Sequence, residues 1–68
     1  MDIHILLVQG SNVSLLYPKT ERASLWINTH ISGDYQVFAK GIVVDSHLIE
    51  PILQGIKESD LAYLIQNN

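Results

Sequence analysis

Residues 23–45 read ASLWINTHISGDYQVFAKGIVVD, and the interpretation of this stretch decides the fold. From Leu25 to Ser32 the odd and even positions alternate in character, which is typical of a strand with one buried and one wetter face. Ser32, Gly33 and Asp34 are turn residues, because Gly tolerates positive φ and the two polar side chains bond nearby backbone. A second alternating run over residues 36–40 completes a predicted β-hairpin.

Two further strands are predicted upstream of this hairpin. Residues 3–8 and 13–18 alternate in the same way and are separated by turn residues at 10–12. Both faces of the first strand are largely apolar, so we expect it to be covered on both sides. Pro18 lacks an amide donor and suits a strand end. With connections this short, four antiparallel strands in meander order are the simplest arrangement.

A helix is predicted downstream, because five apolar residues follow helical three-and-four spacing: Leu48, Ile49, Ile52, Leu53 and Ile56. Its start is open to two interpretations. Asp45 and Ser46 offer oxygens that accept from free helix amides, which would place Pro51 in the second turn. Alternatively Glu50 is the cap and Pro51 takes the favoured first position.

The helical stripe cannot continue in register to the C-terminus, because it would bring Asp60 onto the apolar side. We therefore expect a kink or break near residues 57–60. Ser59 then caps a second short helix that carries Leu61, Leu64 and Ile65. The predicted fold class is α+β, a single domain over 1–68, with a four-stranded antiparallel meander sheet over 1–45 and a helical tail over 46–68.

Chain length and composition predict association. The chain has 68 residues, of which 47% are apolar, and no cysteine. Such a short chain buries a smaller share of its surface than a long one, and no disulfide can compensate. A homodimer that shares its core is the simplest physical answer. No basic start or apolar run long enough for a signal peptide or a membrane span is present, so we expect an intracellular protein that does not contact a membrane.

Charge and residue spacing exclude several function classes. The formal net charge of −3 is unfavourable for an unselective nucleic-acid binder, although Lys19, Arg22 and Lys40 belong to or flank the sheet region. His47 and Glu50 have a spacing that suits metal ligands on a helix, yet no third ligand is identifiable. No nucleophile motif or phosphate-binding glycine loop is present. We expect no metal, no cofactor and no enzyme activity.

One face of the predicted hairpin has the composition of a nucleic-acid surface. By alternation it holds Trp26, Asn28, His30, Phe38 and Lys40. Single-stranded nucleic acid stacks its bases on aromatic rings, at about 1–3 kcal/mol each, and cations follow its backbone. The alternative is that Trp26 and Phe38 are core or dimer-interface residues, as aromatic side chains usually are.

The stretch AKGIVVDSHLIEPILQGIKESDLAYL resembles the C-terminal part of the positive cofactor four family of transcriptional coactivators. Lys40, Gly41 and Ile42 match the family's lysine-glycine-isoleucine step, and Asp45 and Ser46 stand where its helix is capped. The resemblance begins near Arg22. It implies a four-stranded curved sheet with one helix behind it, a homodimer formed partly through the helices, and a sheet surface that accepts unstacked bases.

Two functions follow as expectations. The first is a dimeric single-stranded-DNA-binding protein in which Lys19, Arg22 and Lys40 contact phosphates, Trp26 and Phe38 stack bases, and Asn28 and His30 donate or accept hydrogen bonds. The second is a small acidic protein-interaction module, an adaptor or inhibitor of mobile-element type. Its negative charge favours a positively charged protein partner.

Overall fold

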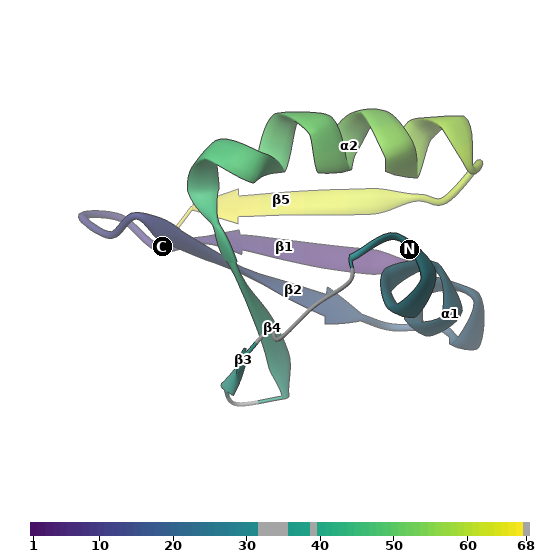
Figure 1. Ribbon diagram of the computed structural model, residues 1–68, viewed down its shortest axis with the longest axis horizontal. Coiled ribbons are helices and arrows are strands. Elements are labelled where there is room, and N and C mark those ends of the chain that lie inside the picture. The colour runs from purple at the N-terminus through teal and green to yellow at the C-terminus, as the bar shows by residue number, and fades with distance from the viewer. Residues whose placement is uncertain (32–35, 39, 68) are drawn as a thin grey trace.

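The computed structural model describes residues 1–31, 36–38 and 40–67, and it forms a five-stranded sheet with two α-helices (Figure 1). In chain order the elements are β1 (Ile3–Leu7), β2 (Val13–Pro18), α1 (Glu21–His30), β3 (Gln36–Phe38), β4 (Gly41–Asp45), the 3₁₀-helix η1 (Ser46–Leu48), α2 (Ile49–Glu58) and β5 (Tyr63–Asn67). The fold is therefore α+β, but the predicted four-stranded meander with a helical tail is wrong.

The sheet is mixed, with strand order β3-β4-β2-β1-β5. β1 pairs with β2, β2 with β4, and β4 with β3, all antiparallel, while β5 pairs parallel to β1. A parallel neighbour requires a crossover connection. Here α2 crosses from β4 over to β5, past the two strands that lie between them. The predicted strands over 3–8 and 13–18 are confirmed as β1 and β2, and Pro18 ends β2 as expected.

The largest correction concerns residues 21–30, which form α1, whereas a strand was predicted from Leu25 to Ser32. The residues that α1 buries are Ala23, Trp26 and Ile27, which have the three-and-four spacing of a helix face. Thr20 is the N-cap, and its hydroxyl accepts from the Ala23 amide at 3.2 Å. The predicted hairpin between 25–32 and 36–40 therefore does not form, and its turn at 32–34 lies outside the described residues.

The hairpin that the structure contains joins β3 to β4. The two strands pair from Gln36 with Val43 to Phe38 with Gly41. Lys40 adopts φ 69°, the left-handed region that tight turns use. The lysine-glycine step that carries the family resemblance is thus a turn followed by the first residue of a strand.

Neither predicted start of the helix is confirmed, because the N-cap of α2 is Leu48. Asp45 precedes η1, but its side chain makes no capping hydrogen bond, and α2 proper begins at Ile49. Pro51 is the third residue of α2 and lies within its first turn. Amides in the first turn have no acceptor within the helix, so the missing amide of proline costs no helical hydrogen bond there. The break near 57–60 is confirmed, because α2 ends at Glu58 and Asp60 adopts φ 59°. The second short helix is wrong: residues 63–67 form β5 instead.

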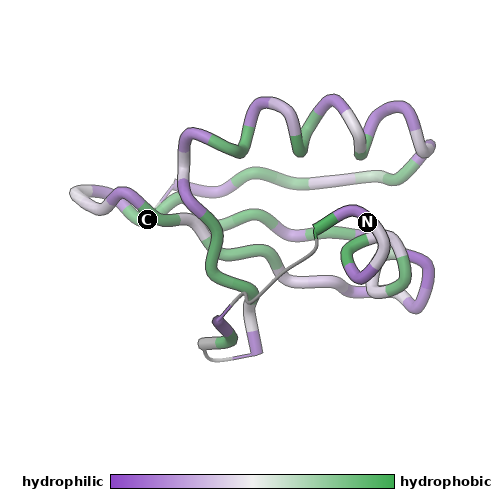
Figure 2. The backbone as a smooth tube through the Cα atoms, viewed as in Figure 1, coloured by the Kyte–Doolittle hydropathy of each residue, from purple (hydrophilic) through white to green (hydrophobic). Residues whose placement is uncertain are grey.

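Both helices cover the same face of the sheet. The buried core joins Ile3 and Ile5 of β1, Leu16 of β2, and Ile42 and Val44 of β4 to residues of α1 and α2. Figure 2 shows apolar segments along the strands and on the sides of the helices that face them. The opposite sheet face, which we call the open face, carries Leu6, Leu15 and Val43 in one row across three strands. Among the described residues, no helix is long and apolar enough to cross a membrane.

Asp2 joins three parts of the chain. Its carboxylate accepts from the Ala62 amide at 2.9 Å and from the Thr20 hydroxyl at 2.8 Å. These two hydrogen bonds, with a smaller contribution from the nearby Arg22 charge, lower the pKa of Asp2 below its usual 3.8. The side chain thus links the start of β1, the N-cap of α1 and the approach to β5.

This lowered pKa predicts a contribution of Asp2 to the pH dependence of stability. The contribution is present above the usual pKa and disappears as the pH falls through the lower pKa of the folded state. Urea midpoints at pH 6 and pH 3 should therefore differ less in Asp2→Asn than in the natural sequence. If the midpoints at pH 6 and pH 3 differed by the same amount in both proteins, Asp2 would not contribute to the pH dependence of stability.

Candidate functional site

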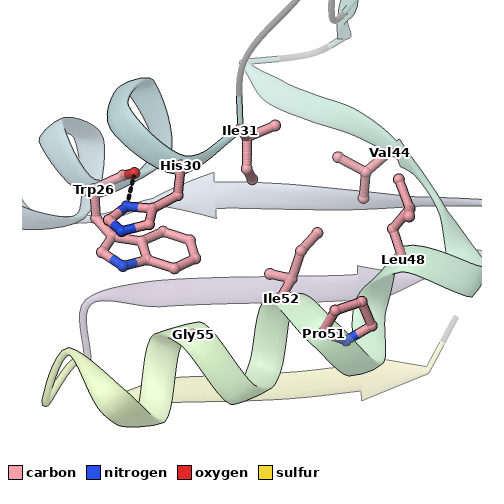
Figure 3. Close-up of a pocket in the computed structure, with 8 residues that line it drawn as sticks. All are labelled: Trp26, His30, Ile31, Val44, Leu48, Pro51, Ile52 and Gly55. Carbon is pink, nitrogen blue, oxygen red and sulfur yellow. Dashed lines mark hydrogen bonds between the residues drawn. The ribbon is translucent and has the colours of Figure 1, made fainter.

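An apolar groove lies between the two helices on the helix-covered side of the sheet (Figure 3). It encloses about 410 Å³ and opens to the surface along one side. Its walls come from the C-terminal half of α1, from β4 and η1, and from the first two turns of α2. The lining residues are Trp26, His30, Ile31, Val44, Leu48, Pro51, Ile52 and Gly55.

Trp26 and His30 form the polar end of this groove. They lie four residues apart on α1, a spacing that places side chains one above the other. The two rings stack, with centroids 4.6 Å apart and planes 18° from parallel. His30 Nδ1–H donates to the Trp26 carbonyl oxygen at 3.0 Å, so Nε2 of the neutral ring is an acceptor. The pair is thereby held in one orientation.

The C-terminal half of α2 fixes the other side of the indole. Trp26 Nε1–H donates to Ser59 Oγ at 2.8 Å, which satisfies its polar atom. A Cβ built on Gly55 would lie 2.9 Å from Trp26 Cζ2, so the indole contacts the helix backbone where a side chain would stand. Trp26 is consequently only 8% exposed, and its ring forms a wall of the groove rather than a free platform.

The groove is suited to bind apolar groups. Apart from His30 and the Trp26 indole, the described residues that line it are aliphatic side chains, a proline and a glycine. Leu48 and Pro51 are exposed at its rim, so an occupant would remove apolar surface from water. A volume of about 410 Å³ falls within the range of small-molecule and side-chain pockets.

The structure brings together two of the seven residues predicted to bind nucleic acid, Trp26 and His30. They share a helix face in the groove, and the hairpin face on which the prediction depended does not exist. The other five lie outside the groove. Arg22 lines a second hollow that also contacts the Trp26 indole, and its Nη2 donates to the Asp60 carbonyl oxygen at 3.4 Å. Asn28 is exposed on α1, Lys40 is in the β3–β4 turn, Lys19 follows β2, and Phe38 ends β3.

A smaller polar hollow of about 320 Å³ lies on the open face. Lys19 Nζ is 5.7 Å from the centroid of the Tyr17 ring, a cation–π distance. The His4 ring centroid lies 6.0 Å from that of Tyr17, and His4 Nε2–H donates to Gln66 Oε1 at 2.9 Å. Of the predicted site residues, only Lys19 is in this hollow.

Most groove residues were missed from the sequence. Leu48 and Ile52 were predicted to lie on an apolar helical stripe, and Gly55 had no predicted role. The signal that could have located the groove is the helical spacing of Ala23, Trp26, Ile27 and His30, which identifies a second helix to pack beside the first.

Comparison of the chain with protein-family models, characterised proteins and solved structures finds no match.

Proposed function

We propose that this protein is a small protein-interaction module that holds apolar side chains of a partner in the groove between α1 and α2. The observation that carries the proposal is the composition of the groove: about 410 Å³, open on one side and lined by apolar groups beside one imidazole. The absence of a metal, a cofactor or enzyme activity remains an expectation from the sequence.

The length of the groove favours a helix as the bound segment. Its wall along η1 and α2 runs from Leu48 to Gly55, eight residues whose ends lie about 10 Å apart along the helix. An amphipathic helix that docks in a groove places its anchors at positions i, i+3, i+4 and i+7, which span the same length. Two or three such anchors would bury the exposed rim of Leu48 and Pro51.

Charge complementarity defines the partner further. The chain carries a net charge of −3, and α2 exposes Glu50 and Glu58, with the Gln54 amide donating to Glu58 Oε2 at 3.2 Å. A partner helix with Lys or Arg beside its apolar anchors would associate faster and more specifically than an acidic one. We also propose that the module works as a homodimer, as its length and apolar content predict.

Because Trp26 is the only tryptophan of the chain, its fluorescence reports on the groove and on the second hollow, lined by Arg22 and Leu25, that also contacts the indole. The probes are two tryptophan-free amphipathic peptides of about five helical turns, one built from Leu and Lys and the other from Leu and Glu. The Leu/Lys peptide should shift Trp26 emission saturably, with at least tenfold higher affinity than the Leu/Glu peptide. Equal affinities, or no shift with either peptide, would contradict the proposal.

A matched pair of variants separates the groove from general charge. Leu48→Asp removes an exposed groove residue, and Leu25→Asp removes an exposed leucine of α1 that does not line the groove. Both add one negative charge. We expect Leu48→Asp to weaken the Leu/Lys peptide about tenfold, since burial of one leucine contributes about 1.5–3 kcal/mol. Leu25→Asp should bind as the natural sequence does.

Single-stranded nucleic acid is the second candidate, supported by the polar hollow on the open face. An aromatic ring, a lysine, an imidazole and an amide lie together there: Tyr17, Lys19, His4 and Gln66. Open sheet faces with such side chains stack bases and contact phosphates. Four Lys and Arg residues against seven Asp and Glu residues make this the weaker candidate.

Fluorescence anisotropy with a labelled oligothymidine at low and moderate salt tests this candidate. Specific binding should fall by about 0.7 log units per log unit of salt for each phosphate contacted. Lys19→Gln should weaken it, whereas Lys57→Gln, which removes an equal charge from the exposed end of α2, should not. No binding at low salt rejects the candidate and leaves the groove proposal intact.

A further inference from the structure

The edge of the sheet formed by β5 is built to accept another strand. We infer that β5 pairs antiparallel with β5 of a second copy, about a two-fold axis, and joins two five-stranded sheets into one. The inference rests on the homodimer of the proposed function and is independent of what the groove binds.

Strand β5 lacks the usual protection of an edge. Natural edge strands are shortened or carry charges, prolines or bulges, since their unpaired amides and carbonyls otherwise recruit other chains. The five residues of β5 read YLIQN, and each pairs in unbroken register with β1 on the other side. The opposite edge, β3, is only three residues long. Of the two edges, β5 is thus the one with room for a partner strand.

Apolar side chains at this edge are exposed on both faces of the sheet. Leu64 is 51% exposed and shares the open face with His4, its partner in β1. Ile65 is 37% exposed and lies on the helix side beside Ile5. An added strand would cover both, whereas a partner docked on one face would cover only one.

The absence of charged residues from β5 allows the added strand to be β5 of a second copy. Each chain carries a net charge of −3, so two copies repel each other over acidic surface, but β5 brings only uncharged residues together. Antiparallel pairing centred on Ile65 places Ile65 opposite its own equivalent and Leu64 opposite Gln66. The surface is therefore complementary to itself, as a two-fold interface requires.

Sedimentation equilibrium tests the interface at micromolar concentrations. The natural sequence should be dimeric, and Leu64→Lys should weaken the dimer at least tenfold, since an edge lysine opposes strand addition. Val37→Lys is the control, because Val37 is 65% exposed on the opposite edge strand and its replacement adds the same charge. Far-UV circular dichroism of both variants should match that of the natural sequence.

A disulfide test fixes the register, because the chain contains no cysteine. Ile65→Cys should form a covalent dimer under mild oxidation, since residues directly opposite in antiparallel strands lie within disulfide reach. Val37→Cys should not. A monomeric natural sequence would overturn the homodimer itself. A dimer that survives Leu64→Lys, or one that Val37→Lys disrupts, would overturn only the β5 interface.

Discussion

Replacing Trp26 with alanine should destabilise the fold by about 3–5 kcal/mol, because the indole joins both helices to the core. Trp26 is 8% exposed, donates to Ser59 at 2.8 Å and fills the space above Gly55. Small domains have total stabilities of about 5–15 kcal/mol, so this one change removes a large share. Urea unfolding followed by far-UV circular dichroism, at one fixed protein concentration, measures the loss.

Trp26→Phe is the matched control. It keeps an aromatic ring against Gly55 but removes the indole N–H that Ser59 accepts, so the expected loss is about 1–2 kcal/mol. Similar stabilities of Trp26→Ala and the natural sequence would mean that the indole is not part of the core. The groove would then lack the fixed wall on which the proposed function depends.

Local sequence was sufficient to predict β1 and β2, because the residues of both strands alternate in character and the turn residues 10–12 separate them. It failed at residues 21–30, where two periods coexist. Leu25, Ile27 and Ile31 fit a strand, while Ala23, Trp26 and Ile27 fit a helix face. Packing against the sheet decides between them, and that contact is not local. The Thr20 cap was the local signal for a helix start.

The same ambiguity explains why two of the residues predicted to share a face are still adjacent in the structure. Residues four apart share one face of a strand and also one face of a helix. Trp26 and His30 therefore remain together in the structure, stacked at 4.6 Å, although the element between them is a helix. Asn28 lies two residues from each, which is the same side of a strand but a different side of a helix.

Strand β5 was unpredictable from its own residues. A five-residue segment with three apolar positions suits a strand or a short helical turn equally. Its pairing with β1, some 60 residues earlier in the chain, selects the strand. Asp60, in the left-handed region at φ 59°, ends the helical path and lets the chain turn back along the sheet. The acidic residue that predicted a break marks the point where this reversal begins.

The second large effect is expected from Leu16→Ala, with a loss of about 2–5 kcal/mol in free energy of unfolding. Leu16 is fully buried in the middle of the helix-covered face, between Ile5 of β1 and Ile42 of β4. Strand hydrogen bonds on both sides keep the backbone from closing the cavity that alanine would leave. Urea unfolding at fixed protein concentration gives the loss directly.

Leu15→Ala offers a control of identical chemistry one residue away. Leu15 faces the open side and is 7% exposed, with Leu6 and Val43 beside it on the neighbouring strands and no helix among the described residues packed above it. Because no helix seals this side, water can reach the space that truncation leaves, and we expect a loss at the low end of the same range, about 2 kcal/mol. Equal losses at the two positions would show that the open face is covered as fully as the other.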